Sequence, residues 1–201
     1  MVELSSCALV LLAGGSSQRM GRPKQLLSIG NRPLLRRAAE ACVESGIGTI
    51  IVVLGARALE IGPVLDGLPV NIRVNDGWEE GMASSIRAGL EEVSLLAPAA
   101  QGLVIALADQ PKFSSRHVTQ LIVAHRETGR SMVASRSAAG FFPPAFFCPK
   151  HFPALRNLRG DAGARALLLA YPEDVAVVET GELGDLDTPE DYLDYLKRSS
   201  P

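Results

Sequence analysis

A glycine-rich loop with two cationic side chains is the stretch of the sequence best suited to chemistry. It covers residues 12–24 (LAGGSSQRMGRPK) and follows a continuous apolar run. Its glycines allow close backbone approach to a ligand, and the backbone amides of such a loop can surround phosphate oxygens. Arg19 offers a planar fork for phosphate, and Lys24 offers a mobile positive charge. We therefore expect a phosphate-binding loop; the plain alternative is a turn with exposed basic residues.

The spacing within this loop argues against two common nucleotide-binding motifs. No Gly-Lys-Ser/Thr sequence closes it, so it is not a Walker loop, and it does not contain GxGxxG. No clear ribose-binding acidic residue follows about 20 residues further on. A Rossmann oxidoreductase is therefore disfavoured.

Aspartates in two later parts of the sequence are candidates for a metal site. Asp109 follows the apolar run 103–107, and Asp187 precedes a Thr-Pro-Glu-Asp sequence typical of a capped helix start. Two carboxylates together with substrate phosphates make the sparse ligand shell that Mg²⁺ prefers. Asp185 competes with Asp187 for the second position. For each carboxylate the alternative is a helix cap or a surface charge.

Five segments, in order along the chain, resemble the motifs of a known family. They are residues 12–24, 75–90 (NDGWEEGMASSIRAGL), 107–111 (LADQP), 160–165 (GDAGAR) and 185–191 (DLDTPED). They resemble nucleotidyltransferases that act on the molybdenum cofactor and, more broadly, sugar-phosphate and methylerythritol-phosphate nucleotidyltransferases. The resemblance covers nearly the whole chain. It implies transfer of a nucleoside monophosphate from a triphosphate to a phosphorylated acceptor, with Mg²⁺ as cofactor and pyrophosphate as product.

The resemblance and the loop chemistry together assign roles to single residues. The catalytic residues would be Arg19, Lys24 and Asp109, and the metal ligands Asp109 and Asp187. The nucleotide-binding residues would be Leu12, Ala13, Gly14, Gly15, Ser16, Arg19, Lys24, Gly55, Ser84 and Asp109. The acceptor-binding residues would be Ser85, Gln110, Asp161 and Arg165. An acceptor phosphate is already anionic and needs no general base, so His117, His125 and His151 receive no role. The alternatives for Ser84, Ser85 and Arg165 are helix capping and a surface turn.

Variation within the motifs favours one nucleotide and one acceptor. Residues 22–27 (RPKQLL) and the GMASS sequence resemble the cytidylyl branch, and Pro23 stands where the guanylyl branch more often has aspartate. CTP and molybdopterin are therefore the expected substrates, with a molybdoenzyme as an implied partner. Phe142 stands where the family commonly has a glycine, and this departure leaves the identity of the acceptor undecided. Guanylyl transfer, transfer to a sugar or polyol phosphate, and a non-catalytic nucleotide-binding maturation factor are the alternatives.

The elements that must position these residues alternate between strands and helices. Continuous apolar runs predict strands buried on both faces, and short strands and amphipathic helices are expected between them. The strands are expected at residues 7–12, 49–54, 70–74, 103–107 and 132–134, and the helices at 33–44, 79–93 and 116–128. This order predicts an α/β fold, a three-layer Rossmann-like sandwich with a mostly parallel sheet. By resemblance it is the fold of nucleotide-diphospho-sugar transferases.

One segment breaks this rhythm. Residues 141–152 contain five phenylalanines and three prolines, and we expect a small antiparallel excursion or a lid near the site. No linker or repeat is visible, so residues 1–201 are expected to form a single nucleotidyltransferase domain.

The amino-acid composition limits the class of protein, its partners and its cellular compartment. The chain is 47% hydrophobic and 21% charged, with a formal net charge of −2, which suits a globular protein and provides no basic field for nucleic acid or membrane. Cys7, Cys42 and Cys148 are far apart and fit a reducing compartment. The apolar run near the N-terminus is too short for a membrane span and lacks a basic flank. We expect a cytoplasmic protein with no nucleic-acid or membrane partner.

Overall fold

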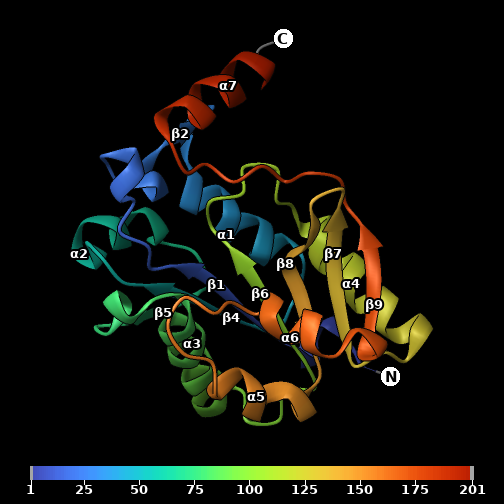
Figure 1. Cartoon of the computed structure of the whole chain (residues 1–201). Coiled ribbons are helices and arrows are strands. Elements are labelled where there is room, and N and C mark those ends of the chain that lie inside the picture. Colours follow the sequence, from blue (N-terminus) through green and yellow to red (C-terminus); the bar gives the residue numbers. More distant parts are fainter. Residues whose placement is uncertain (1, 200–201) are drawn as a thin grey trace.

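A mostly parallel sheet of seven strands forms the centre of the computed structural model, which describes residues 2–199 (Figure 1). In spatial order the strands are β5 (Asn71–Val74), β4 (Thr49–Leu54), β1 (Ala8–Ala13), β6 (Leu103–Leu107), β8 (Gly140–Phe147), β7 (Met132–Ser137) and β9 (Val175–Glu179). Strand β8 runs antiparallel to both of its neighbours, and the other neighbouring pairs are parallel. The predicted sheet is thus confirmed.

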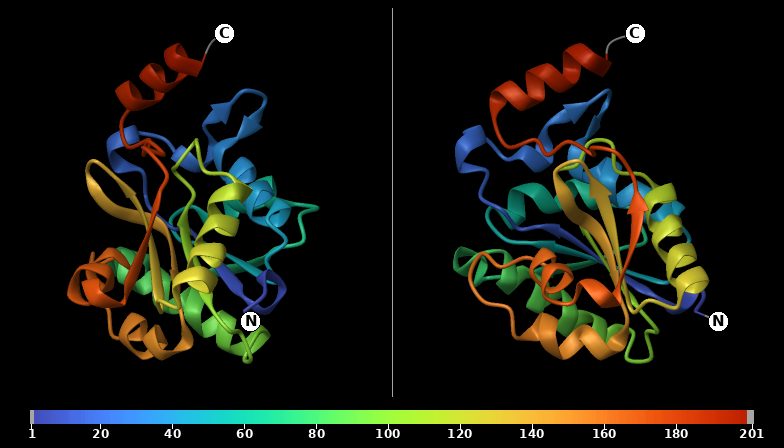
Figure 2. Two further views of the ribbon diagram at one scale, coloured as in Figure 1. Left: turned by 90° about the vertical axis from the view of Figure 1, so that its right-hand side faces the viewer. Right: turned by 45° about the vertical axis from the view of Figure 1, so that its right-hand side comes forward.

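Helices cover both faces of this sheet and complete the predicted three layers (Figures 1 and 2). One face packs against α1 (Leu34–Glu44), α2 (Ala58–Ile61) and α4 (Ser115–Thr128). The other face packs against α3 (Met82–Leu96), α5 (Phe152–Arg156) and α6 (Arg165–Ala170). Among residues 2–199, no helix is long and apolar enough to cross a membrane.

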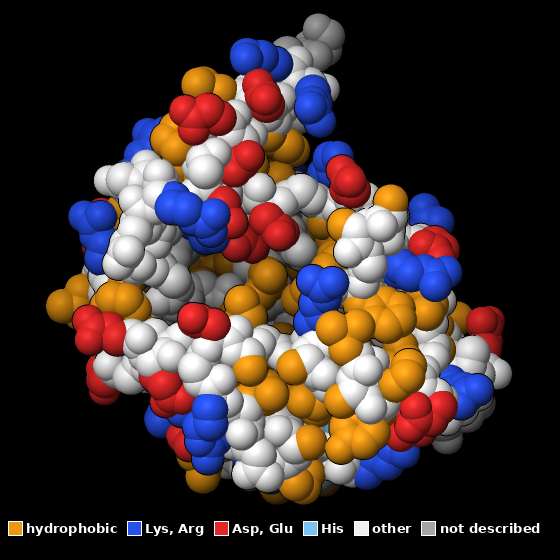
Figure 3. Space-filling model, in the orientation of Figure 1, with side chains coloured by type: hydrophobic (Ala, Val, Ile, Leu, Met, Phe, Trp, Pro, Cys, Tyr) orange, Lys and Arg blue, Asp and Glu red, His pale blue; other side chains and the backbone are white. Residues whose placement is uncertain are grey.

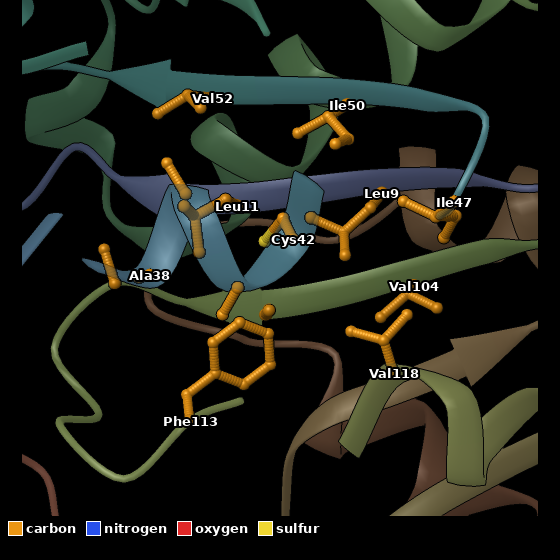
Figure 4. Close-up of a cluster of buried hydrophobic side chains, with 14 of the residues drawn as sticks. Leu9, Leu11, Ala38, Cys42, Ile47, Ile50, Val52, Val104, Phe113 and Val118 are labelled. Atoms are coloured by element: carbon orange, nitrogen blue, oxygen red, sulfur yellow. The ribbon is translucent and has the colours of Figure 1, made fainter. Parts of the chain in front are cut away.

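Strand β1 shows why the sequence places a continuous apolar run at the centre. Leu9 and Leu11 enter the core shared with α1 and α4, where Val118 also lies (Figure 4). Val10 points to the opposite core and shares it with Ile86 of α3. Successive side chains of a strand alternate between faces, so a strand covered on both sides must be apolar at every position.

A small antiparallel hairpin and the last helix form a separate unit at one end of the sheet. The hairpin joins β2 (Ser28–Ile29) to β3 (Arg32–Pro33), and α7 (Pro189–Ser199) lies beside it, projecting from the body (Figures 1 and 2). The Tyr192 hydroxyl donates to the Ser28 carbonyl oxygen at 2.7 Å. The predicted helix start is confirmed, because Thr188 Oγ1 accepts the Asp191 N–H and the Asp191 carboxylate accepts the Thr188 N–H.

The helix expected at residues 79–93 starts later than predicted. Residues Trp78–Glu80 form a separate 3-10 turn, and α3 begins at Met82. Gly81 separates them with φ 117° and ψ −174°, a conformation that is essentially restricted to glycine. The break turns the beginning of α3 toward the carboxyl ends of the central strands.

The segment expected as an antiparallel excursion or lid is a strand within the main sheet. Strand β8 pairs antiparallel with β6 and β7, so the antiparallel direction is confirmed. Phe146 and Phe147 are fully buried, one in each core. A lid must be free to move, and large aromatic side chains buried on both faces hold this half of the strand in place. Strand β9 at the sheet edge was not expected from the sequence.

Candidate active site

A cavity of about 560 Å³ opens at the carboxyl ends of β1 and β6. Figure 3 shows it as a hollow whose rim carries acidic and basic side chains next to each other. Ligands of open α/β sheets bind at this edge of the strands. The predicted residues that line it are Leu12, Ala13, Gly14, Gly15, Ser16, Arg19, Lys24, Ser85, Asp109, Asp161 and Asp187. The structure therefore brings parts of all five motifs to one place.

Lys24 lies at the centre of a charge cluster in this cavity. Its ammonium group is 2.5 Å from Asp109 Oδ2 and 2.9 Å from Asp187 Oδ1. Arg19 binds the other oxygen of Asp187 at 2.8 Å. Lys24 and Asp109 are mostly buried, with side chains 16% and 17% exposed, whereas Asp187 is 35% exposed. Residues more than 80 positions apart in the sequence thus form one ionic network.

The electrostatics of this cluster follow from its geometry. Burial opposes the charge of Lys24, but the carboxylates of Asp109 and Asp187 outweigh it and raise the pKa of the ammonium group. Partial burial opposes ionisation of Asp187, but Lys24 and then Arg19 outweigh it and lower the pKa of that carboxyl group. Lys24 and Asp187 therefore carry opposite charges at neutral pH.

Asp185 also reaches the cavity but has different partners. It accepts a hydrogen bond from Gln110 Nε2 at 3.1 Å. The surrounding protein atoms and the nearby Asp109 carboxylate raise the pKa of Asp185, although its side chain keeps exposed surface. Unlike Asp187, it has no ion pair with Lys24 within residues 2–199. The cluster therefore contains Asp187 rather than Asp185.

The carboxylates of this cluster suit a hard divalent cation. Asp109 Oδ1 is buried and has no hydrogen-bond partner among the described residues, so it is free to bind a ligand. Within residues 2–199 no three His, Cys, Asp or Glu side chains converge as a metal site. Mg²⁺ commonly needs only one or two carboxylates and takes its other ligands from water and substrate phosphates. Asp109 and Asp187 fit that pattern.

Two predicted nucleotide-binding residues lie outside the cavity lining. Gly55 packs behind Gly14, and an added Cβ there would lie 2.5 Å from the Gly14 carbonyl oxygen and 2.7 Å from Trp78 Cβ. Ser84 is buried, where it accepts a hydrogen bond from Asn75 and donates to the Gly81 carbonyl. Both positions are thus explained by packing and hydrogen bonding within the protein.

Two predicted acceptor-binding residues lie in a neighbouring cavity of about 320 Å³. Gln110 and Arg165 line it together with Phe142, the residue that departs from the family pattern. Gln110 Oε1 is buried and has no hydrogen-bond partner among the described residues. Asp185 lines both cavities and so marks the place where they meet.

Several cavity residues escaped the sequence analysis. Trp78, Gln25, Gln18 and Met82 line the main cavity beside the predicted residues. Trp78 is the single tryptophan of the chain and lies in the second motif, which was a usable signal. Gln25 gave no signal because an uncharged residue after a candidate lysine is inconspicuous in a sequence.

The histidines have local structural partners, in line with the absence of an assigned role. His117 Nδ1 accepts the Ser114 N–H at the start of α4, and His151 contacts the Ser131 hydroxyl in a buried position. His125, near the end of α4, contacts the carbonyl oxygen of Arg130, which follows that helix. None of the three is among the residues that line the main cavity.

Comparison with known proteins places the chain among nucleotide-handling proteins. The family model described as "MobA-like NTP transferase domain" matches residues 9–175. The purine catabolism protein PucB of Bacillus subtilis is 32% identical over 201 residues, covering 94% of this chain and 95% of that protein. Nicotine blue oxidoreductase of Paenarthrobacter nicotinovorans is 35% identical over 202 residues, covering 93% and 95%. The structure of Rv0371c from Mycobacterium tuberculosis in complex with manganese superposes with a TM-score of 0.80 at 25% identity, covering 95% and 98%.

Proposed function

The chain belongs to the family of MobA-like NTP transferase domains, and from this premise we propose that it transfers a nucleoside monophosphate from a nucleoside triphosphate to a phosphorylated acceptor. One observation carries the proposal. The glycine-rich loop, Lys24, Arg19 and the two carboxylates Asp109 and Asp187 line a single cavity. A cavity that combines loop amides, two cations and two metal-ligating carboxylates suits a metal-bound triphosphate.

Each residue of the cluster has a separate role in the proposed reaction. The triphosphate lies against the loop at residues 14–16, with Arg19 and Lys24 close enough to neutralise charge that grows on the leaving pyrophosphate. Asp109 and Asp187 would hold Mg²⁺, which when bound would draw charge from the phosphates and favour in-line attack. The manganese complex of Rv0371c supports use of a divalent cation by this fold.

The acceptor enters from the neighbouring cavity. Arg165 and Gln110 bind it there, while Ser85 and Asp161 contact it on the side of the main cavity. The attacking group is the acceptor's phosphate oxygen, which forms the new bond to the α-phosphorus as the bond to pyrophosphate breaks. This oxygen is already ionised, so the reaction needs no base.

We assign CTP as the donor and molybdopterin as the acceptor, from the motif variants at Pro23 and in residues 81–85. The product would be a cytosine dinucleotide of the cofactor, delivered to a molybdoenzyme in the cytoplasm. Guanylyl transfer, or transfer to a sugar or polyol phosphate, would use the same cluster with a different base or acceptor.

The test is pyrophosphate release from CTP in the presence of Mg²⁺ and molybdopterin. We expect release by the wild-type protein, none after addition of EDTA, and none from Asp109→Ala. Asp66→Ala serves as the matched control, because Asp66 lies outside the cavities described above and its carbonyl oxygen, which the substitution keeps, is the atom that accepts from Arg36. Undiminished release by Asp109→Ala, or in EDTA, would rule out the two-aspartate mechanism.

A second candidate function follows from the relative named an oxidoreductase, which is 35% identical over nearly the whole chain. In that case the same loop would bind the pyrophosphate of a nicotinamide dinucleotide. An assay for oxidation of NADH or NADPH distinguishes the oxidoreductase from the transferase. Quinonoid dyes serve as electron acceptors, and the absorbance of the nicotinamide is the readout. Turnover of the dinucleotide that persists in EDTA, without pyrophosphate release from any nucleotide, would favour the oxidoreductase.

A further inference from the structure

The side chain of Gln25 is buried beneath the glycine-rich loop and is 2% exposed. Its amide nitrogen donates to the carbonyl oxygens of Ala13 at 2.8 Å and Gly15 at 3.0 Å. Its amide oxygen accepts the hydroxyl of Ser17 at 3.3 Å. The Ser17 hydroxyl in turn accepts the backbone N–H of Lys24 at 3.1 Å. One side chain therefore ties together both ends of the loop.

These hydrogen bonds fix the direction of two peptide units. In a trans peptide the C=O and the following N–H point in opposite directions. The Ala13 and Gly15 carbonyls point toward Gln25, so the N–H groups of Gly14 and Ser16 must point away from it. Both residues line the main cavity, and neither N–H donates to another residue in the described part of the chain.

The loop also holds an unusual backbone conformation at Ser17. Its φ of 56° is left-handed, which costs energy for any residue other than glycine. The hydroxyl of Ser17 is held by Gln25 on one side and by the Lys24 N–H on the other. The same contacts thus maintain this turn and fix the position of the Lys24 backbone.

We propose that Gln25 is a positioning residue that directs the N–H groups of Gly14 and Ser16 into the cavity, where they bind the polyphosphate of the nucleotide. This inference rests on the proposed function for the identity of the ligand. The chemistry that recognises the ligand is a row of phosphate oxygens facing two parallel N–H donors. Both polar atoms of the Gln25 amide are engaged by the loop, so Gln25 acts by holding the two carbonyls rather than by a hydrogen bond of its own to the ligand.

The first test removes the amide and uses inorganic tripolyphosphate as the probe, so that base recognition plays no part. In ¹⁵N-labelled wild-type protein we expect the amide signals of Gly14 and Ser16 to shift on titration. In Gln25→Leu the two carbonyls lose their donors and turn toward solvent. We expect the Kd for tripolyphosphate to rise roughly tenfold or more, and the two amide shifts to disappear, since the loss of directed donors weakens binding.

The second test works within one folded protein. In Gln25→Glu the new carboxyl group lies among carbonyl oxygens in a buried place, which raises its pKa. The protonated form can donate to one carbonyl, whereas the ionised form repels both. We expect the ratio of variant to wild-type Kd for tripolyphosphate to fall several-fold between about pH 8 and about pH 6, as the carboxyl group gains its proton.

Gln18→Glu is the matched control for the added charge. Gln18 also lines the cavity, but its side chain is exposed. A carboxyl group there titrates near its ordinary pKa of about 4.3, below the tested range. We expect this variant to bind tripolyphosphate more weakly, with a variant-to-wild-type ratio that stays constant between the two pH values.

The outcomes separate this inference from the proposed function. A wild-type protein that shows the Gly14 and Ser16 shifts, yet transfers no nucleotide, keeps the role of Gln25 and removes the transferase. Equal tripolyphosphate affinity in Gln25→Leu and wild type overturns the positioning role, as does a Gln25→Glu ratio independent of pH. A lowered melting temperature with an unchanged Kd would mean that Gln25 stabilises the fold alone.

Discussion

At the scale of single residues, the site is an ionic cluster in which a lysine lies between the two carboxylates that we propose as metal ligands. Lys24 contacts both Asp109 and Asp187. A cation that binds these carboxylates must compete with the ammonium group, and a triphosphate would draw the ammonium group away from them. In the proposed mechanism, the binding of metal at this cluster is therefore coupled to the binding of nucleotide.

Replacing Lys24 by alanine should have opposite effects on rate and on metal affinity. Losing one preorganised donor should cost about 2–4 kcal/mol of transition-state stabilisation. Without nucleotide, Mn²⁺ should bind Lys24→Ala more tightly than wild type, because the competing charge is gone. The measurements are pyrophosphate release and titration of Mn²⁺ by electron paramagnetic resonance.

Lys197→Ala is the control for the loss of a positive charge, because Lys197 lies on α7 and pairs with Asp194. It should leave both measurements unchanged. A decrease in rate below tenfold for Lys24→Ala would count against contact between Lys24 and the transferring phosphate. Weaker Mn²⁺ binding in that variant would contradict competition between lysine and metal.

The two late aspartates should respond differently to removal of charge. Asp187→Asn weakens a proposed metal ligand and removes the ion pairs of Asp187 with Arg19 and Lys24, leaving Lys24 paired with Asp109 alone, so the rate should fall by about a hundredfold or more. Asp185→Asn keeps the acceptor for the Gln110 amide, so the rate should fall less than about tenfold. Dependence of the rate on Mg²⁺ concentration gives a second readout. The reverse order of effects would make Asp185 the metal ligand.

The charged members of the site could be predicted from the sequence, whereas the residues that hold them in place could not. Arg19, Lys24 and Asp109 could be selected because their charges follow apolar runs and suit phosphate or metal. The choice between Asp185 and Asp187 depends on which side chain faces Lys24, and spacing alone does not contain that information. Gln25 acts through buried hydrogen bonds to carbonyls, which leave no trace in composition or periodicity.

At the scale of elements, the accuracy of the sequence-based expectations followed the burial of each segment. Strands β4 and β6 start and end where predicted, since all of their positions except Thr49 are apolar, as a strand covered on both faces requires. Strand β9 was missed because it lies at the sheet edge, where only Ala176 in it is buried. The antiparallel direction of β8 was expected, but its place inside the main sheet was not, because its pairing with β6, which is not its neighbour in the chain, depends on tertiary contacts.

The glycine that separates the 3-10 turn from α3 provides a test at this scale. An added Cβ at Gly81 would lie 2.5 Å from Asp161 Oδ1 and 2.6 Å from the Gly160 carbonyl oxygen. Gly81→Ala should lower the free energy of unfolding by about 3 kcal/mol or more, through backbone strain and displacement of the Gly160 loop. Urea denaturation measures the first effect, and CTP affinity reports the second.

Gly129 at the end of α4 is the matched control, because its φ is 67° and an added Cβ would meet nothing within 4 Å. Gly129→Ala should cost about 1–2 kcal/mol from backbone conformation alone. Its CTP affinity should equal that of wild type. Equal destabilisation by the two substitutions would show that the contact with the Gly160 loop carries no energy.

At the scale of the whole molecule, the sheet gathers distant motifs at one edge. Strands β1 and β6 are parallel neighbours, so the loops after them meet although about 90 residues lie between. The segments after β9 return to the same edge and bring Asp185 and Asp187 into the cavity. Binding of a nucleotide there connects both ends of the chain and should stabilise the fold as a unit.

Thermal unfolding in the presence of nucleotides therefore tests the choice of base on the intact protein. A ligand that binds only the folded state stabilises it by about 2.7 kcal/mol at a concentration of 100 times Kd. A site built to hydrogen-bond one base leaves buried polar groups unpaired with another. We expect CTP with Mg²⁺ to raise the melting temperature more than GTP, ATP or UTP. Calorimetric titration of all four gives the affinities.

Each alternative function predicts that a different ligand stabilises the protein most in this experiment. Asp109→Ala is the control, and it should lose most of the Mg²⁺-dependent rise in melting temperature. A preference for GTP above tenfold would assign guanylyl transfer and leave the fold and the cluster as described. Stronger protection by NADH or NADPH, independent of Mg²⁺, would favour the oxidoreductase. A shift with CTP but no pyrophosphate release with any phosphorylated acceptor would instead indicate a nucleotide-binding factor. In the proposed mechanism, binding uses the loop and cations, whereas transfer also needs an acceptor phosphate, which we place beside Arg165.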